Sequence, residues 1–265
     1  SDFAKDATGS NPALIAESLV NTFRYGNAVL AMPDPSDDKW KDSALEKALN
    51  ANLDAHKPVG LGIFKSDVAD GDPGHGVVAD GYGYSGGKIC YHINMGWGGD
   101  GDVWYDLPGI LEYDLIKSVI YNIYSRSAGE IISGKLATSS DVTVTMASTS
   151  VGSKGAYVSI EGVGFSSSVW IGNDDGNFVF VGVPSDTEFT ITAKLAGHSF
   201  PRKTVRTGRS GATATSVGNV WGVIIKEPLY SGESPFGGGG CDAAALPALF
   251  AAVGAGVVLF VRKKR

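Results

Sequence analysis

The chain has 265 residues, of which 43% are hydrophobic and 19% are charged, so it can bury a sizeable core and is not globally disordered. Its 37 glycines and 11 prolines favour turns and strands over long helices. The formal net charge is −6, and because the last 24 residues carry +3, the rest carries −9 (−6 minus +3), which argues against a nucleic-acid partner.

The first part of the chain, residues 1–127, mixes helical and strand patterns. Apolar residues recur at helical spacing in two places, which predicts one helix over Pro12–Phe23 and another over Ser43–Leu53. Pro58 stops the second helix because its ring cannot continue the helical hydrogen bonding. Short apolar runs between glycine turns predict strands. These strands are Pro58–Phe64, Gly76–Tyr82, Lys88–Ile93 and Val103–Leu107.

The second part, residues 128–226, is rich in threonine, serine, valine and glycine, and apolar residues alternate with polar ones in short runs. Asn173–Asn177, between two such runs, is a tight-turn signal. About seven or eight short strands at this spacing predict an all-β sandwich. The expected strands are Glu130–Leu136, Val142–Ala147, Ala156–Glu161, Val169–Ile171, Phe178–Val183, Glu188–Leu195, Lys203–Arg206 and Val217–Ile225.

The last part combines a glycine-rich linker, residues 227–240, with Cys241, an uncharged run of 19 residues over Ala243–Val261 and a basic end over Arg262–Arg265. At about 1.5 Å per residue, a helix over that run just reaches across a bilayer core of roughly 30 Å. The basic end predicts a cytoplasmic C-terminus and a protein body outside the cell. We therefore expect a transmembrane helix and an extracellular or cell-surface location.

The order of glycine linker, cysteine, apolar run and basic end resembles bacterial C-terminal sorting tags. The resemblance implies that residues 241–265 form a sorting signal and that Cys241 is a processing or lipidation point. An exported protein normally starts with an apolar signal peptide, whereas this chain starts at Ser1 without one. We therefore expect the natural N-terminus to lie upstream.

One stretch carries residues suited to catalysis. His75 opens a predicted strand between two glycines, Asn94 closes the next strand, and a Gly-Trp-Gly-Gly turn over Gly96–Gly99 follows. An imidazole in that position can accept a proton from a thiol, and the asparagine amide can hold its other ring nitrogen. The indole of Trp97 can shield that hydrogen bond from water. Such a base needs a thiol partner to produce a nucleophile.

These segments resemble a known family. Gly74–Gly81 (GHGVVADG) resembles the G-H-A-x-x-x-D-G segment of streptopain-type cysteine peptidases, and Asn94–Gly99 (NMGWGG) resembles their N-W-G-W-G-G segment. The resemblance covers residues 10–120 and implies the C-terminal half of a papain-like α+β domain, a mostly antiparallel sheet with flanking helices. It also implies a peptidase in which His75 is the general base, Asn94 orients it and Trp97 covers both.

The chain departs from the family in three ways. Met95 stands where the family usually has tryptophan, which changes the aromatic cover or a substrate contact, and Gly76 replaces the usual alanine. Together with Gly74 and Trp97, Met95 is expected to bind substrate or cover the site. The family's nucleophilic cysteine belongs to a helix upstream of these segments, and no matching segment occurs here, so the chain alone is expected to be inactive. Cys90, inside a predicted strand, is expected to be a buried structural thiol.

The second part also resembles a known type. Ile132–Leu136 and Asp175–Pro184 resemble segments of the transthyretin-like, carboxypeptidase-regulatory sandwich, which implies a spacer or binding module rather than a catalyst.

Two alternatives to a peptidase remain open: a catalytically dead homologue, and a surface binding or adhesion protein whose main role belongs to the sandwich. No cofactor and no metal are expected, since His75 and His92 lack a third ligand at metal-binding spacing. The expected partners are a protein or peptide substrate and the cell membrane, through residues 243–261, and the oligomeric state stays open.

Overall fold

The structure is a computed structural model that describes residues 11–34, 36, 39–67, 74–138 and 143–228, and the backbone of two short strands, β1 (Asp2–Phe3) and β2 (Thr8–Gly9). The predicted linker from residue 229 on, Cys241 and the predicted membrane helix over residues 243–261 lie outside this range. Within the described residues, no helix is long and apolar enough to cross a bilayer.

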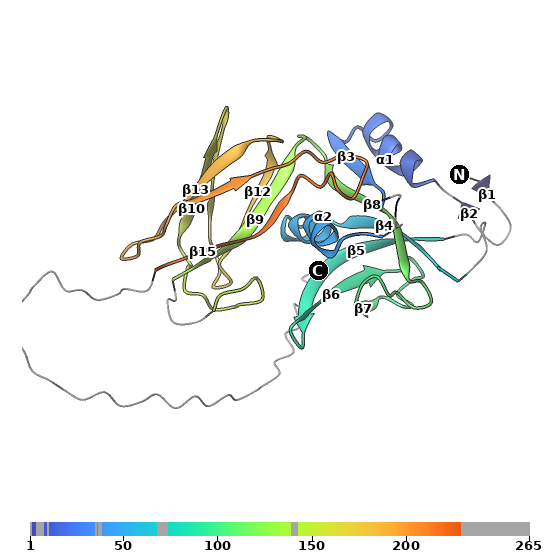
Figure 1. Ribbon diagram of the computed structural model, residues 1–265, viewed down its shortest axis with the longest axis horizontal. Helices are drawn as coiled ribbons and strands as arrows, with labels where there is room; N and C mark the ends of the chain where they lie inside the picture. The colour runs from blue at the N-terminus through green and yellow to red at the C-terminus, as the bar shows by residue number, and fades with distance from the viewer. Residues whose placement is uncertain are drawn as a thin grey trace, which may run out of the picture.

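The N-terminal part, up to residue 127, is built on a six-stranded antiparallel sheet (Figure 1). The sequence predictions are confirmed for β4 (Val59–Phe64), β5 (His75–Ser85), β6 (Lys88–Asn94) and β7 (Val103–Tyr105). The patterns do not predict β3 (Asn27–Ala31) or β8 (Leu115–Tyr124). The strand order is β3-β8-β4-β5-β6-β7, and β8 is buried along most of its length, so its residues do not alternate between apolar and polar.

Two helices accompany this sheet, both where helical spacing predicts them. α1 (Pro12–Asn21) starts at a cap in which the side chain of Asn11 accepts a hydrogen bond from the backbone N–H of Ala13 (2.9 Å). It ends two residues earlier than predicted. α2 (Asp42–Asp54) turns an apolar face inward. The leucines that predict α2 are all buried: Leu45, Leu49 and Leu53.

Residues 128–228 form two sheets that share one core, and we call them the two-sheet region. One sheet has the order β11-β10-β13-β14, and the other has the order β12-β9-β15, with β15 parallel to β9. Residues of both sheets, among them Ile132, Phe178, Ile160 and Phe189, form a single buried cluster. The strands are β9 (Glu130–Ala137), β10 (Tyr157–Gly162), β11 (Phe165–Trp170), β12 (Asn177–Val183), β13 (Glu188–Lys194), β14 (Lys203–Arg206) and β15 (Val220–Lys226).

One strand prediction in this region is wrong. Residues 143–147 are not a strand, although valine and threonine alternate there. Thr145 and Ser148 form a turn instead: the carbonyl of Thr145 accepts from the N–H of Ser148 (3.0 Å), and the hydroxyl of Ser148 accepts from the N–H of Thr145 (2.9 Å). A period-2 pattern becomes a strand only where a neighbouring strand offers an edge to pair with.

The two parts of the molecule are joined by more than the connecting chain. α2 contacts β4, β5 and β8 and also β9, β12 and β15, so it lies between the two parts (Figure 1). The segment after β14 returns to the N-terminal part and pairs with Met32. The N–H of Met32 donates to the carbonyl of Ala212 (3.0 Å), and its carbonyl accepts from the N–H of Ala214 (2.7 Å).

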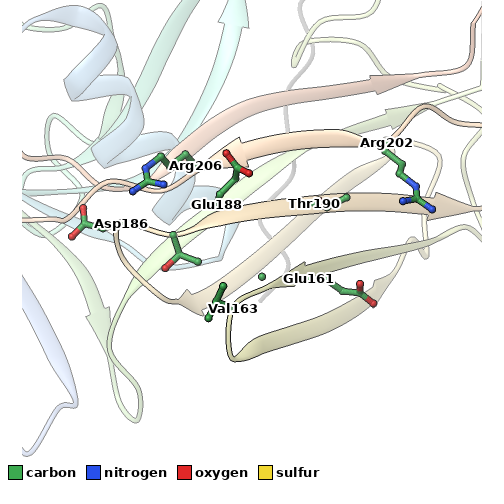
Figure 2. A pocket seen from close by; sticks show the side chains of 9 residues that line it. Glu161, Val163, Asp186, Glu188, Thr190, Arg202 and Arg206 are labelled. Atoms are coloured by element: carbon green, nitrogen blue, oxygen red, sulfur yellow. The ribbon is translucent and has the colours of Figure 1, made fainter.

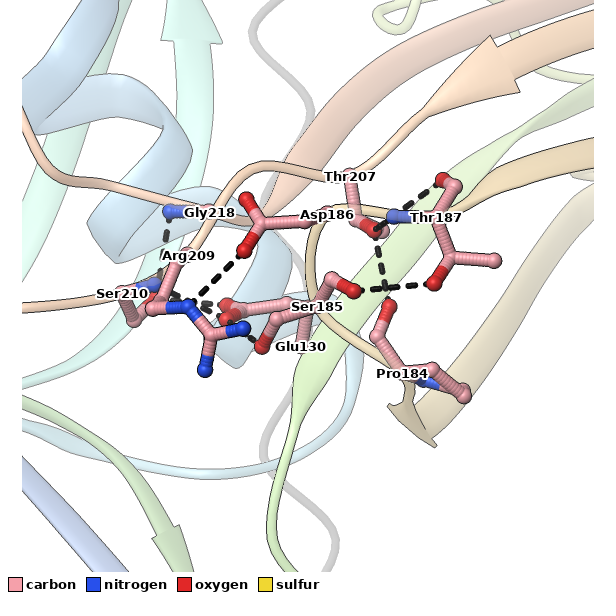
Figure 3. A network of polar contacts seen from close by, with 9 residues as sticks. All are labelled: Glu130, Pro184, Ser185, Asp186, Thr187, Thr207, Arg209, Ser210 and Gly218. Atoms are coloured by element: carbon pink, nitrogen blue, oxygen red, sulfur yellow. Dashed lines mark hydrogen bonds and ion pairs between the residues drawn. The ribbon is translucent and has the colours of Figure 1, made fainter.

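A buried polar network reinforces this junction, and Figure 3 shows the part of it around Glu130. The carboxyl group of Glu130, a residue only 2% exposed, accepts from the hydroxyl of Ser185 (2.7 Å) and from the N–H (2.8 Å) and hydroxyl (2.5 Å) of Ser210. Nδ2 of Asn122, on β8, lies 3.3 Å from Oε2 of Glu130 and 3.1 Å from Oδ1 of Asn219. Buried polar groups from both parts therefore satisfy one another across the junction.

Candidate active site

His75 is the first residue of β5, opposite Ile63 of β4, and its side chain is half-buried. Its Nε2 lies 2.8 Å from the main-chain carbonyl oxygen of Met95. A carbonyl oxygen only accepts, so Nε2 carries a hydrogen, and in the neutral ring the lone pair is then on Nδ1. The nitrogen that can accept a proton from a nucleophile is therefore Nδ1.

The structure corrects the expected hydrogen bond between Asn94 and the ring of His75. Oδ1 of Asn94 accepts from the backbone N–H of Gly96 (2.9 Å), and this is the only hydrogen bond of that side chain among the described residues. In the sheet Asn94 pairs with Val78, three residues beyond His75, which is roughly 10 Å along the strand. The side chain of Asn94 therefore stabilises the turn that follows it, and the main-chain carbonyl of Met95 contacts the ring of His75.

The carbonyl of Met95 is held by the glycine turn. The N–H of Met95 donates to Oδ1 of Asp102 (2.7 Å), on the far side of that turn. Gly96 and Gly98 have φ of +76° and +73°, a region that other residues rarely adopt, so the repeated glycines are needed for the chain to bend back. The side chain of Met95 is fully buried in the core, which corrects the expectation that it contacts substrate.

Asp102 was not predicted as a site residue. The signal for it is an acidic residue directly after a glycine-rich turn, where its carboxylate can cap free N–H groups.

Two aromatic rings lie beside the imidazole. The indole of Trp97, which is 44% exposed, stacks on His75 with ring centroids 4.8 Å apart and planes 25° apart. The ring of Tyr113 lies at 6.2 Å and 28°, with Nζ of Lys65 5.5 Å from the tyrosine centroid. Trp97 thus stacks on the imidazole, whereas Tyr113, 38 positions after His75, carries no sequence signal that links it to the site.

Gly74 and Gly76 flank His75 but differ in their surroundings. A Cβ on Gly74 would lie 2.5 Å from ring atoms of Phe64 and 2.6 Å from the carbonyl oxygen of Ile63. A Cβ on Gly76 would meet nothing within 4 Å. Gly74 therefore allows the backbone to approach β4 closely just before the imidazole, a packing role rather than a demonstrated substrate contact.

We expect Gly74→Ala to destabilise the protein by roughly 1–3 kcal/mol, because the added methyl overlaps Phe64 and main chain. Gly76→Ala, the matched control, is expected to change the free energy of unfolding by less than about 0.5 kcal/mol. Urea unfolding of the two variants beside the wild type measures both values. Equal effects of the two substitutions would contradict the packing difference.

Cys90 does not reach the imidazole. It is partly buried on β6 and pairs with Gly83, eight positions beyond His75 along β5 (83 minus 75), which is roughly 26 Å. His92, on the same strand, is engaged elsewhere: its Nδ1 lies 2.6 Å from Oδ1 of Asp80. Over the part of the chain that the structure describes, no group of three or more potential ligands could hold a metal ion.

A histidine whose Nε2 is fixed by a carbonyl and whose face is covered by an indole defines a candidate general base. Residues 1–105 match the model of the Peptidase C10 family. These residues, which include His75, Asn94, Met95 and Trp97, are similar to this family of streptopain-type cysteine peptidases. Tyr113, β8 and the two-sheet region lie beyond the match. Neither a search of curated proteins nor a search of solved structures found a match.

Proposed function

We propose that this chain is the histidine-bearing part of an exported cysteine endopeptidase. The family match over residues 1–105 supports peptidase chemistry and a protein substrate. The observation that carries the assignment of the base is the 2.8 Å contact between Nε2 of His75 and the carbonyl of Met95. It leaves Nδ1 as the proton acceptor that a thiol needs.

In the proposed mechanism, Nδ1 of His75 takes the thiol proton and the thiolate sulfur attacks the carbonyl carbon of the peptide bond. The imidazolium then gives its proton to the leaving amine, and an acyl-enzyme remains. Water, deprotonated by the same Nδ1, hydrolyses the thioester. The carbonyl of Met95 and the face of Trp97 both favour the imidazolium that forms in the first step.

The nucleophile is proposed to come from a segment outside residues 1–265. Among the described residues Cys90 is the one free thiol, and its register on β6 places it too far from His75. Residues 1–265 by themselves are then expected to hydrolyse nothing.

The remaining domain assignments are proposals that rest on sequence patterns. They are a peptidase-like domain over residues 1–127, a carboxypeptidase-regulatory-like sandwich over 128–226, a linker over 227–240 and a sorting signal over 241–265. By this proposal the apolar run over 243–261 anchors the protein at the cell surface, and Cys241 is a processing or lipidation point.

The test is covalent labelling with a thiol-directed epoxide inhibitor, applied to the protein that carries the segment upstream of Ser1. The wild type should be labelled at one cysteine, and His75→Ala should lose labelling because the thiol stays protonated. Asn94→Ala, which leaves the carbonyl of Met95 in place, should still be labelled. A folded wild-type protein that takes up no inhibitor would end the peptidase proposal.

The second candidate is a catalytically dead homologue. The observation that favours it is that Met95 stands where the family usually has tryptophan. The geometry weakens this argument, because residue 95 contacts the imidazole through its main-chain carbonyl while its side chain lies in the core. Absence of labelling would favour this candidate.

A further inference from the structure

The sheet β11-β10-β13-β14 has one face in the core and one face open to solvent. Val158, Ile160, Phe189 and Ile191 point into the core, and the residues between them along β10 and β13 point outward. α2 packs against the other sheet of the two-sheet region. Nothing among the described residues covers the outward face.

Two large aromatic side chains stand side by side on this face. Tyr157 and Trp170 are direct cross-strand partners on β10 and β11, so they project on the same side of the sheet, and they are 57% and 58% exposed. The indole lies against Gly172, where an added Cβ would be 3.0 Å from Cζ3. The glycine therefore allows the indole to lie over the backbone, and the two exposed rings form a local aromatic patch of the kind that ligands contact.

Hydroxyl groups follow along the same face. Ser159 and Ser168, the next outward pair, hydrogen-bond each other at 2.8 Å. Thr192 is paired with Ser159, and Thr190 is paired with Glu161. The face thus passes from an aromatic end to a polar end within one row of side chains.

The polar end is an open hollow of about 790 Å³ (Figure 2). Carboxylates and guanidinium groups line it together: Glu161, Asp186, Glu188, Arg202 and Arg206. The side chain of Asp186 is paired with Arg209 (2.8 Å), whereas the side chains of the other four form no hydrogen bond or ion pair with described residues. Their donors and acceptors are free for a ligand.

We propose that this face binds a neutral carbohydrate chain, a function separate from peptidase chemistry. The C–H face of a sugar ring packs on the electron-rich face of an indole or phenol. Each sugar hydroxyl both donates and accepts, so it is matched by carboxylates and guanidinium groups standing together. A strongly charged ligand would meet both signs in the hollow. A peptide strand would add to the edge of β11 or β14 rather than to the face.

The length of the face fits a chain rather than a single sugar. Tyr157 and Glu161 are four positions apart on one strand, which is roughly 13 Å. A ligand that reaches from the aromatic pair to the hollow must therefore contain several sugar units.

The proposal is tested by affinity electrophoresis of the chain through native gels, each containing one soluble polysaccharide: a β-glucan, a xylan, a mannan or a levan. An acidic polysaccharide gel and a casein gel serve as comparators. At least one neutral gel should retard the wild type. Trp170→Ala and Tyr157→Ala should each weaken retention at least about tenfold, since central aromatic contacts dominate such surfaces. Gly172→Ala, whose added methyl would lie 3.0 Å from Cζ3 of Trp170 and so shift the indole, should weaken retention too.

Phe23→Ala, which removes another exposed aromatic ring (68% exposed) far from this face, should leave retention unchanged. Circular dichroism of every variant checks that the fold is retained. No retardation in any neutral gel, retardation by casein or the acidic polysaccharide alone, or retention that survives loss of both aromatic rings would overturn the proposal.

Discussion

Replacing His75 with alanine is expected to lower kcat/KM for a peptide substrate at least about 10³-fold in the protein that carries its nucleophile. The variant loses the proton acceptor for the thiol and the proton donor for the leaving amine in one step. Cleavage of a fluorogenic peptide at substrate concentrations below KM measures the ratio directly. A loss smaller than about tenfold would show that another group deprotonates the thiol.

The matched control is Asn94→Ala, which separates the amide from the carbonyl as the group that orients the ring. Because Oδ1 of Asn94 bonds the N–H of Gly96 rather than the imidazole, we expect kcat/KM to fall by no more than about tenfold, the effect of one lost hydrogen bond in the turn. A loss as large as that of His75→Ala would show that the amide holds the ring during catalysis.

Replacing Glu130 with alanine is expected to lower the free energy of unfolding by roughly 3–5 kcal/mol. The substitution leaves the hydroxyl of Ser185 and the N–H and hydroxyl of Ser210 buried without their acceptor, each at a cost of about 1–3 kcal/mol before relaxation. Urea unfolding followed by tryptophan fluorescence measures the loss. A change below about 1 kcal/mol would mean that water replaces the carboxyl group at the junction.

Two further variants sharpen this result. Glu130→Gln keeps the volume but offers an NH₂ group to donors, so its loss should be intermediate, roughly 1–2 kcal/mol. Glu188→Ala removes an exposed carboxylate from the same region and should cost less than about 0.5 kcal/mol.

Because the network joins both parts of the molecule, we also expect the wild type to unfold in one transition. Two separate transitions would show that the parts are independent.

The sequence predicts the elements better than it predicts their contacts. Both helices and the strands that frame His75 follow from spacing, because their apolar residues recur at the period of the element. The sequence pattern does not predict β8, because a strand buried on both faces shows no alternation of apolar and polar residues. The junction is not predicted either, because Asn122 and Asn219 are polar residues 97 positions apart, and nothing in a single sequence indicates that their side chains form a hydrogen bond.

The candidate site shows the same limit at the scale of single atoms. Residue types indicate His75 and Trp97, since an imidazole and an indole are rare and chemically distinctive. They cannot indicate the carbonyl of Met95, because every residue has a carbonyl and only the path of the backbone decides which one meets the ring. Asn94 is predicted to orient the ring because its side-chain amide can accept a hydrogen bond from the imidazole. In the structure the main-chain carbonyl of the next residue, Met95, accepts that bond instead.

The most direct measurement is a long-range ¹H–¹⁵N NMR spectrum of the chain at a pH where histidines are neutral, with the ring of His75 assigned by its disappearance in His75→Gln. We expect a ring with the hydrogen on Nε2 and the lone pair on Nδ1, held in that tautomer by the carbonyl of Met95. A ring with the hydrogen on Nδ1, or one that averages between the two tautomers, would contradict the proposed base.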